Sequence, residues 1–499
     1  MKKILFLQLP KIPLSYDDVI ENVPFAAGCI AAHIDFAKVV IPDHQVINKM
    51  GDAALVRYIL KHRPDMLALT LYLWNSERSL YIASKIKEHM PRCRIIVGGP
   101  EVSPDNAWLM KNKCIDHFVV GEGEGSISEK MRRIVIGKES AFITSPYIAG
   151  TLKMSPHEPV YIEAQRGCAY RCAFCNYSKG SKKVRYMDVD IVREVLVMAR
   201  KTGARDIVFV DPTFNDHPEF SRLLDMLIEV NRDRYFEFNA EIKPHTLNDE
   251  DIARINKAGF ATLEVGLQTT NVATQKKISC HIPLRKFSRN VNSLAKKIVI
   301  RLDLIAGLPG EDDNDIVRSI RYVKKHHPRA ELFLYHLSVL PGTKMREQSE
   351  FYQDKPPYFV LGDHGRTADK FRKLAHVSLD ALPSLGEIYH HRKKYNLISV
   401  RGKKSLGNVS TMNIIEITHN GLGALKKVTE DNPFCRFVVF VKGSIDVDDV
   451  LASLKLQFDQ YLNRSRVYFE SDIANIQIGY LDTTAGKGSR RRCSLSRRL

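Results

Sequence analysis

Hydrophobic positions in the first 145 residues fall into short runs separated by amphipathic stretches. A helical spacing of apolar residues covers 79–89. The apolar runs, which are typical of buried strands, lie at residues 3–9, 66–73, 95–97 and 117–120. Strands that alternate with helices predict a doubly wound parallel sheet of the Rossmann-like type. Ligands of such sheets bind where the strands end, and the last two runs end in glycine-containing turns.

A second alternating region begins at Tyr161 and continues to about Met345. Amphipathic stretches at 188–200, 218–230 and 312–326 are typical of helices. The apolar runs between the amphipathic stretches are at 161–166, 206–210, 236–242, 261–268, 299–306 and 331–337. Six strand–helix units predict a curved, partial (β/α)6 barrel, in which the chemistry is expected at the carboxyl ends of the strands.

The last part of the chain has a different pattern, which predicts a small α+β domain. Helical spacing occurs at 367–381 and 446–463, and alternating segments occur at 411–418, 436–441, 466–470 and 476–480. The predicted α/β organisation is therefore a Rossmann-like domain (1–145), a linker (146–160), a barrel (161–345), an α+β substrate or accessory domain (346–485) and a basic disordered tail (486–499).

Composition narrows the class of protein. The chain has 499 residues and a formal net charge of +18, and 486–499 contribute six basic residues and no acidic one. No window holds the eighteen apolar residues of a membrane span, and the opening run is too short for a signal peptide. Nine cysteines, an odd number without the spacing of a disulfide framework, predict a reducing, cytoplasmic environment. Basic charge favours anionic partners, but the aromatic residues show no clustering typical of an RNA-binding sheet.

Three of the cysteines crowd into one short segment, RGCAYRCAFC, where the first predicted barrel strand ends. Cys168, Cys172 and Cys175 could hold three irons of a [4Fe–4S] cluster and leave the fourth iron open to a small molecule. A structural zinc site would need a fourth ligand nearby, and three thiols cannot all pair as disulfides. The spacing therefore favours an iron–sulfur cluster.

In this context the cysteine motif resembles that of the radical S-adenosylmethionine (SAM) superfamily. The segments 266–269, 304–311 and 340–343 are similar to later strand ends of that family's barrel. The resemblance implies that Phe174 lies against the adenine and that Asp211, Pro212 and Thr213 stand where the methionine amino group is contacted. It further implies SAM contacts from strand-end residues, namely Gln268, Ile305 and Gly307.

The region 2–125 is similar to the cobalamin-binding domain that precedes the barrel in one branch of these enzymes. The resemblance implies that the turns at Gly98, Gly99, Gly121 and Gly123 hold the nucleotide tail of cobalamin. The chain departs from many cobalamin proteins because its first strand runs into Gln8-Leu9-Pro10 rather than Asp-x-His-x-x-Gly. This departure leaves open a relict domain that binds no cobalamin.

The resemblance implies reductive cleavage of SAM, with an electron from a donor such as flavodoxin or ferredoxin, and removal of hydrogen from an unactivated C–H bond. With cobalamin, the expected reaction is C-methylation of a peptide or natural product. The cofactors carry such chemistry, and the protein contributes position and exclusion of water. The expected partners are the electron donor and a small molecule or peptide, with no membrane and no nucleic acid.

Two alternatives remain open. An epimerase of ribosomally made peptides would need a thiol outside the cluster loop as hydrogen donor, and Cys280 and Cys435 are the candidates, although each is more typical of a small buried hydrophobe. A protein of another class would bind RNA or peptide and keep an inert cluster. Methylthiotransferases need three further cluster cysteines near the amino terminus, whereas Cys29, Cys93 and Cys114 are spread widely and are typical of packing residues.

Overall fold

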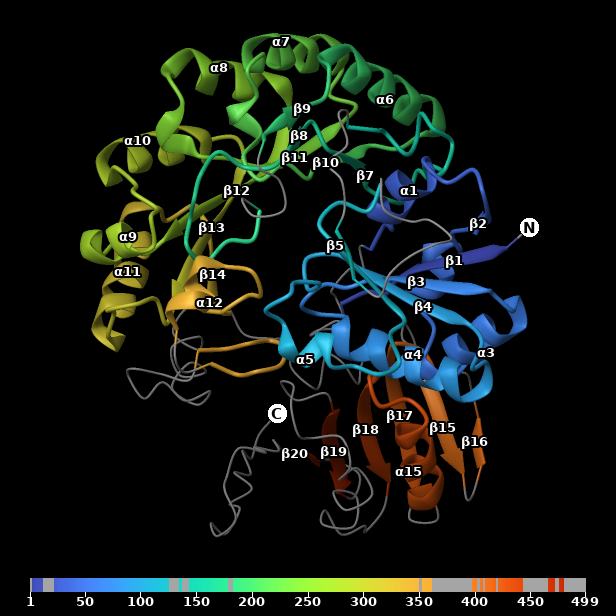
Figure 1. The fold of residues 1–499 in the computed structure, drawn as a ribbon. Helices are drawn as coiled ribbons and strands as arrows, with labels where there is room; N and C mark the ends of the chain where they lie inside the picture. Colours follow the sequence, from blue (N-terminus) through green and yellow to red (C-terminus); the bar gives the residue numbers. More distant parts are fainter. Residues whose placement is uncertain are drawn as a thin grey trace.

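The computed structural model arranges the chain around three six-stranded sheets (Figure 1). It describes residues 2–11, 22–124, 134–136, 143–177, 183–349, 352–360, 397–401, 404–406, 409–418, 421–442, 465–471 and 475–479. No helix within these ranges is both long and apolar enough to cross a membrane.

The first sheet is parallel throughout, in the order β2-β1-β3-β4-β5-β6. Its strands are β1 (Lys3–Gln8), β2 (Lys38–Val40), β3 (Met66–Thr70), β4 (Arg94–Gly98), β5 (His117–Val120) and β6 (Ile134–Ile136). The helices of this region are α1 (Phe25–Ala31), α2 (His44–Ile47), α3 (Asp52–His62), α4 (Ser76–His89) and α5 (Ala107–Met110). Side chains alternate along a strand, so Leu5 and Leu7 of β1 join one hydrophobic cluster while Ile4 and Phe6 join another. The predicted doubly wound sheet is confirmed.

The second sheet is the predicted partial barrel, parallel in the order β7-β10-β11-β12-β13-β14. Its strands are β7 (Val160–Ile162), β10 (Asp206–Phe209), β11 (Glu237–Glu241), β12 (Phe260–Gln268), β13 (Val299–Ala306) and β14 (Glu331–His336). The outer helices are α6 (Val189–Thr202), α7 (Phe220–Val230), α8 (Asp249–Ala258), α9 (Val272–Lys277), α10 (Leu284–Leu294) and α11 (Asp313–His326), drawn from green to yellow along the rim (Figure 1).

Sequence signals at the helix ends explain where the barrel helices begin and stop. Asp188 caps α6 by accepting a hydrogen bond from the backbone of Asp190, and Gly203 ends the helix in the left-handed conformation with φ +83°. Asp312 and Asp315 form a reciprocal capping box at the start of α11. These caps fix the residues at which α6 ends and α11 begins, and therefore where the connecting loops lie.

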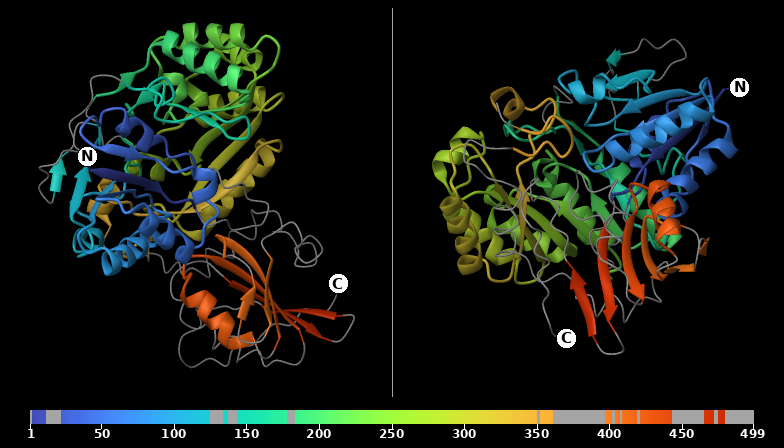
Figure 2. Two further views of the ribbon diagram at one scale, coloured as in Figure 1. Left: turned by 90° about the vertical axis from the view of Figure 1, so that its right-hand side faces the viewer. Right: turned by 90° about the horizontal axis from the view of Figure 1, so that it is seen from below.

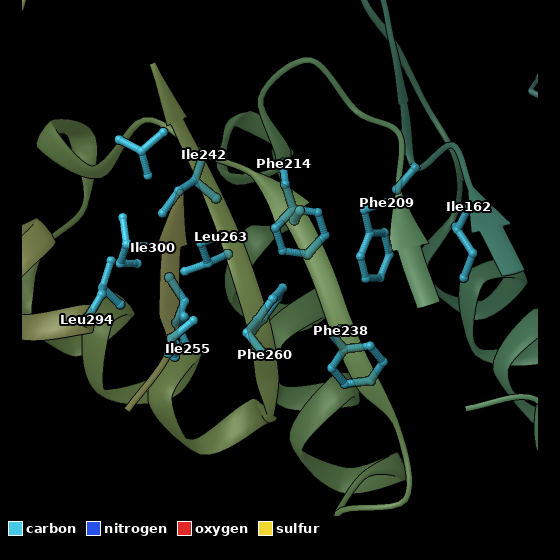
Figure 3. Packing of buried hydrophobic residues seen from close by; sticks show 14 of the residues in the cluster. Ile162, Phe209, Phe214, Phe238, Ile242, Ile255, Phe260, Leu263, Leu294 and Ile300 are labelled. Atoms are coloured by element: carbon cyan, nitrogen blue, oxygen red, sulfur yellow. The ribbon is translucent and has the colours of Figure 1, made fainter. Parts of the chain in front are cut away.

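The barrel strands bury one face against these helices. Four aromatic rings pack together among aliphatic side chains, with centroids of Phe209 and Phe214 4.5 Å apart and those of Phe238 and Phe260 5.7 Å apart (Figure 3). Each such ring contributes about 1.5–3 kcal/mol by leaving water. Because alternate residues face this core, the remaining residues of each strand face the concave interior of the barrel.

The third sheet has the order β16-β15-β17-β18-β19-β20. Its elements are β15 (Leu397–Arg401), β16 (Lys404–Leu406), β17 (Met412–Thr418), α15 (Leu422–Glu430), β18 (Arg436–Lys442), β19 (Ser465–Ser471) and β20 (Asn475–Gly479). The four central strands are parallel and the two edge strands are antiparallel. The predicted helices at 367–381 and 446–463 and the tail at 486–499 lie outside the described residues.

This third sheet packs against the N-terminal domain (Figure 2). The backbone N–H of Phe434 donates to Oδ2 of Asp52 at 2.8 Å, and Met50 forms an isolated β-bridge with Ser410. Asp52 is fully buried and also pairs with Arg78 at 2.7 Å. A buried ion pair therefore lies at the junction of the two domains.

The segment predicted as a linker is also packed. Tyr147 is buried, and its hydroxyl oxygen accepts a hydrogen bond from the backbone of Tyr161 at 3.1 Å. Thr151 donates to the carbonyl of Gly28 in α1 at 2.8 Å. These contacts hold the start of the barrel against the first helix of the N-terminal domain.

Candidate functional site

The cysteine loop leaves the barrel at the carboxyl end of β7. It lies between β8 (Gln165–Arg166) and β9 (Arg185–Tyr186), which pair antiparallel. Gly167 makes the turn out of β8 with φ +86°, a conformation that glycine adopts without steric cost. The buried backbone of Ala173 anchors the loop: its N–H donates to Ile278 O and its carbonyl accepts from Met345 N, both at 2.9 Å. The loop is therefore held on both sides.

The thiols of Cys168, Cys172 and Cys175 are half-buried, and the charge of Cys172 adds to the rise in the pKa of both Cys168 and Cys175. Burial is the largest cause for Cys168, and for Cys175 burial raises the pKa to about 11. Iron binds thiolates and favours their deprotonation. Among the described residues, no three His, Cys, Asp or Glu side chains converge on one metal ion. A [4Fe–4S] cluster gives each ligand its own iron, so three thiols on one short loop fit the ligand set of such a cluster.

The two candidate donor thiols lie in different places. Cys280 follows α9 and its thiol hydrogen-bonds to that of Cys172, a contact that, together with burial, raises the pKa of Cys172. Cys435 is buried at the junction with the C-terminal sheet, where its sulfur lies 3.8 Å from Oδ2 of Asp52. The structure therefore brings Cys280 to the cysteine loop and does not bring Cys435 there.

The residues expected to contact SAM lie at the same edge of the barrel as the loop. Phe174 packs against the barrel core from the loop itself. Asp211, Pro212 and Thr213 are buried immediately after β10. Gln268 ends β12 with φ +62°, Ile305 lies on β13, and Gly307 follows β13.

Asp211 is the most informative of these residues. Its Oδ1 accepts a hydrogen bond from the backbone of Gln165 at 2.9 Å, while its buried Oδ2 has no hydrogen-bond partner. Burial raises the pKa of Asp211 well above its ordinary value, and the charge of Glu163 adds to the rise. A buried carboxylate oxygen without a partner is costly, and an ammonium group would satisfy it. The residue therefore fits the amino group of a bound amino acid such as the methionine part of SAM.

The four glycines expected to contact cobalamin lie at the carboxyl ends of β4 and β5. Gly99 has φ +106° and a Cβ there would lie 2.6 Å from Leu71 O, and a Cβ at Gly123 would lie 2.6 Å from Ile30. The protein's own packing therefore requires glycine at these two positions. Gly98 has no such conflict, because a Cβ there would meet no atom closer than 3.7 Å, and Gly121 turns the chain with φ +86°.

An aromatic pair follows β3 at the same edge of the N-terminal sheet. Tyr72 and Trp74 stack with centroids 4.7 Å apart and an interplanar angle of 3°, and Trp74 is 50% exposed. A flat apolar surface at the carboxyl edge suits a large planar cofactor, and the sequence pattern of an apolar run ending in aromatic residues could have indicated it.

A charge network joins the two domains beside the cysteine loop. Arg166 pairs with Glu124 and Glu163 at 2.6 Å each, and Arg185 donates to Oε2 of Glu122 at 3.0 Å. These side chains are mostly buried. Sequence reasoning identified the glycines of the 121–124 turn and missed its two glutamates, because they lie 44 and 42 residues from Arg166 and nothing local links them to it.

A wall of carboxyl groups lines the concave face of the barrel. Glu241, Glu264 and Asp303 come from three adjacent strands, with Glu241 and Glu264 directly paired in register. The pKa of Glu241 and that of Asp303 are each raised to about 8, first by desolvation and then by the charge of Glu264. Lys243 opposes the rise at Glu241. Sequence reasoning missed these groups, although acidic residues at alternate positions of apolar runs were a signal for a polar interior.

Comparison with protein families gives two matches. The radical SAM superfamily matches residues 162–323, and the B12 binding domain matches residues 23–129. The first range covers the barrel with its cysteine loop, and the second covers most of the N-terminal sheet with both glycine turns. Iron–sulfur, SAM and cobalamin chemistry are therefore the cofactor chemistry that the two domains imply.

Curated relatives match at low identity. The cobalamin-dependent radical SAM methyltransferase TokK of Streptomyces tokunonensis is 23% identical over 408 residues, which is 70% of this chain and 57% of TokK. A 2-(S-pantetheinyl)-carbapenam-3-carboxylate methyltransferase of Streptantibioticus cattleyicolor is 24% identical over 336 residues, 56% of this chain and 47% of that protein. The chain thus spans about half the length of these relatives.

Among solved structures, the radical SAM methyltransferase TsrM of Kitasatospora setae, with tryptophan substrate and a SAM analogue bound, has a TM-score of 0.55. The alignment covers 70% of this chain and 78% of TsrM at 16% identity. At this identity the likeness shows a shared fold.

Proposed function

We propose that this chain, a member of the radical SAM superfamily in the branch with an N-terminal B12-binding domain, is a methyltransferase that modifies a carbon atom of a small molecule or peptide. The proposal rests on the contact between the carboxyl edge of the barrel, which carries the cysteine loop, and the carboxyl edge of the N-terminal sheet. The cysteine loop at the end of β7 and the turn at the end of β5 are tied directly through Arg166 and Glu124. Asn176, next to Cys175, also donates to Pro100 O at 3.2 Å.

The chain's own residues would bind and orient the cofactors. Cys168, Cys172 and Cys175 would hold the cluster, and Oδ2 of Asp211 would accept from the amino group of SAM. When bound, the cluster and SAM supply one-electron chemistry for hydrogen abstraction, and cobalamin supplies methyl transfer. The glycine turns and the Tyr72–Trp74 surface would hold cobalamin at the opposite side of the same space.

The barrel interior would receive the substrate. Glu241 and Asp303 are placed along its wall with pKa values of about 8, so each can hold a proton near neutral pH. Lys243 lies beside the loop, with its Nζ 3.6 Å from the centroid of the Tyr170 ring. These groups would orient polar parts of the substrate and exclude bulk water. Neither candidate thiol supports the epimerase, because Cys280 contacts the cysteine loop itself and Cys435 lies at the junction with the C-terminal sheet.

The direct test needs no substrate. The protein is reconstituted anaerobically with iron and sulfide, loaded with hydroxocobalamin and supplied with reductant and SAM. We expect about one cobalamin per chain, as for a single site, together with methylcobalamin and SAM cleavage products. A reconstituted protein that retains no cobalamin on gel filtration would exclude the methyltransferase.

A further inference from the structure

A buried polar group joins the turn after β4 to the segment after the barrel. The hydroxyl of Tyr358 donates to Oε2 of Glu101 at 2.8 Å, and Nδ2 of Asn106 donates to the Tyr358 oxygen at 2.9 Å. The guanidinium of Arg346 lies 4.9 Å from the centroid of the Tyr358 ring. We call Glu101, Asn106, Arg346 and Tyr358 the polar brace, and all four are at least nine-tenths buried.

Backbone contacts surround the polar brace. The N–H of Gly342 donates to both carboxylate oxygens of Asp105, at 3.0 and 2.8 Å, and Nη1 of Arg346 donates to Val339 O at 3.1 Å. Gly342 precedes α12 (Lys344–Gln348), a short helix after the last barrel strand. The turn at 98–106 is therefore fixed to the segment that closes the barrel.

The helix α12 continues this connection to the cysteine loop. Met345, next to Arg346, donates its N–H to the carbonyl of Ala173, which lies between Cys172 and Cys175. A hydrogen-bonded path thus runs from the β4 turn through the polar brace and α12 to the middle of the loop.

Two features show that the polar brace is over-determined. Burying a carboxyl group costs more free energy than burying an apolar residue of similar volume. A buried network in which every polar group has a hydrogen-bond partner stabilises one particular arrangement of its residues. Tyr358 has φ +53°, a left-handed conformation that is uncommon for a bulky residue and that persists only when its surroundings enforce it. Such strain is typical of positions where geometry matters more than stability.

We propose that Tyr358, Glu101 and Arg346 are positioning residues that fix the β4 turn against the cysteine loop and so set the separation of cobalamin from the cluster. The proposal rests on the proposed function for what the two sites hold. Methyl transfer depends on such a separation, because a displacement of 1 Å can cost about 10²-fold in rate.

The test compares three variants of the full chain. Tyr358→Phe removes the hydroxyl from the polar brace. Glu101→Gln keeps an oxygen that can accept from Tyr358, and Tyr352→Phe removes a hydroxyl from a neighbouring ring on which Arg346 also lies, at 4.8 Å. The first readout is amide hydrogen exchange of 98–106 and 340–348 in the protein without cofactors. The second is the rate of methyl transfer from SAM to reduced cobalamin in the reconstituted protein.

We expect Tyr358→Phe to speed exchange in both segments by about tenfold and to slow methyl transfer by about tenfold or more, with iron and cobalamin content unchanged. Tyr352→Phe should keep both the exchange rate and the methyl-transfer rate within about twofold of the wild type, and Glu101→Gln should keep the methyl-transfer rate within about twofold. Unchanged exchange in Tyr358→Phe, or faster exchange with an unchanged methyl-transfer rate, overturns the proposal.

A second variant keeps the test decisive if Tyr358→Phe does not fold. Asp105→Ala removes the contacts to Gly342 and the 3.5 Å ion pair with Nε of Arg346, from a side chain that is 42% exposed. The same two changes are expected, and unchanged exchange in this variant also overturns the proposal. If the wild type takes up no cobalamin, the proposed function fails, whereas the exchange results still decide whether the polar brace couples the turn to the loop.

Discussion

Nη1 of Arg166, two residues before the first cysteine of the loop, lies 2.6 Å from Oε1 of Glu124 in the turn after β5. The same guanidinium binds Glu163 at the end of the first barrel strand. One side chain therefore connects the loop, the barrel and the N-terminal sheet, and its positive charge compensates carboxylates that would otherwise be buried without a partner.

Replacing this arginine should destabilise the protein. Arg166→Ala leaves Glu124 and Glu163 uncompensated in a mostly buried place, and we expect a loss of about 3 kcal/mol in the free energy of unfolding, measured in urea. Arg193→Ala is the control, because Arg193 pairs with Glu229 on the surface and such pairs contribute about 0–1 kcal/mol. Equal losses for the two variants would show that the Arg166 network is no stronger than a surface pair.

Removing one cluster thiol should abolish the iron–sulfur centre. We expect Cys172→Ala, reconstituted anaerobically, to lose iron–sulfur absorbance and all SAM cleavage, because two thiols cannot hold the cluster. Cys280→Ala removes a buried thiol that touches Cys172 and should keep its iron. Full iron content in Cys172→Ala would contradict the ligand assignment.

Asp211→Asn should weaken SAM binding. The substitution removes the charge that would pair with an ammonium group, and charged hydrogen bonds contribute about 1.5–3 kcal/mol, which is about ten- to a hundredfold in affinity. Binding is measured as the change in the EPR signal of the reduced cluster during a SAM titration. Asp216→Asn, which alters the neighbouring acceptor of the Tyr170 hydroxyl, is the control. Equal affinities for SAM in the two variants would show that Asp211 does not bind SAM.

The protein should become less stable between about pH 4.5 and 7 because of Glu101. Burial raises the pKa of this carboxyl group from 4.5 to about 7. In that window the unfolded chain loses the proton while the folded protein keeps it, so the free energy of unfolding falls as pH rises and levels off above 7.

Glu101→Gln cannot titrate and should be more stable than the wild type at pH 8, by about 3 kcal/mol at most. Urea unfolding curves recorded for both proteins at several pH values from 5 to 8 measure the difference in the free energy of unfolding. Parallel pH profiles for the two proteins would show that Glu101 does not titrate as its burial requires.

The mass of the product separates methylation from epimerisation. In deuterated water, an added methyl group from SAM gives a gain of about fourteen mass units, whereas return of hydrogen from a solvent-exchanged thiol gives a gain of about one. We expect the first result, and we expect it to survive Cys435→Ala. A gain of one unit that disappears in Cys280→Ala would establish the epimerase instead.

Much of the fold follows from local patterns. The run at 117–120 is β5 and the run at 299–306 is β13, with the predicted bounds, because buried strands of a parallel sheet are short, largely apolar runs, and each of these two is followed by a glycine-containing turn. The cysteine loop could also be predicted, because the three cysteines that identify it lie within eight residues of one another.

The contacts between domains could not be predicted in this way. Glu101 and Tyr358 are 257 residues apart, and neither has a neighbour in the sequence that indicates the other. The acidic wall of the barrel was missed because Glu241, Glu264 and Asp303 come from three different strands and form a group only when these strands are side by side. Long-range polar contacts have no periodicity to detect.

The position of the C-terminal sheet affects the order in which the molecule can be completed. Asp52 and Arg78 are buried at the junction with this sheet, yet Phe434, which donates to Asp52, is synthesised 382 residues later. At about 5–20 residues per second, the ribosome needs about 20–80 s for that interval. During this time the nascent N-terminal domain lacks the cover that its buried ion pair will have in the finished protein, which makes that period the one in which a chaperone would protect it.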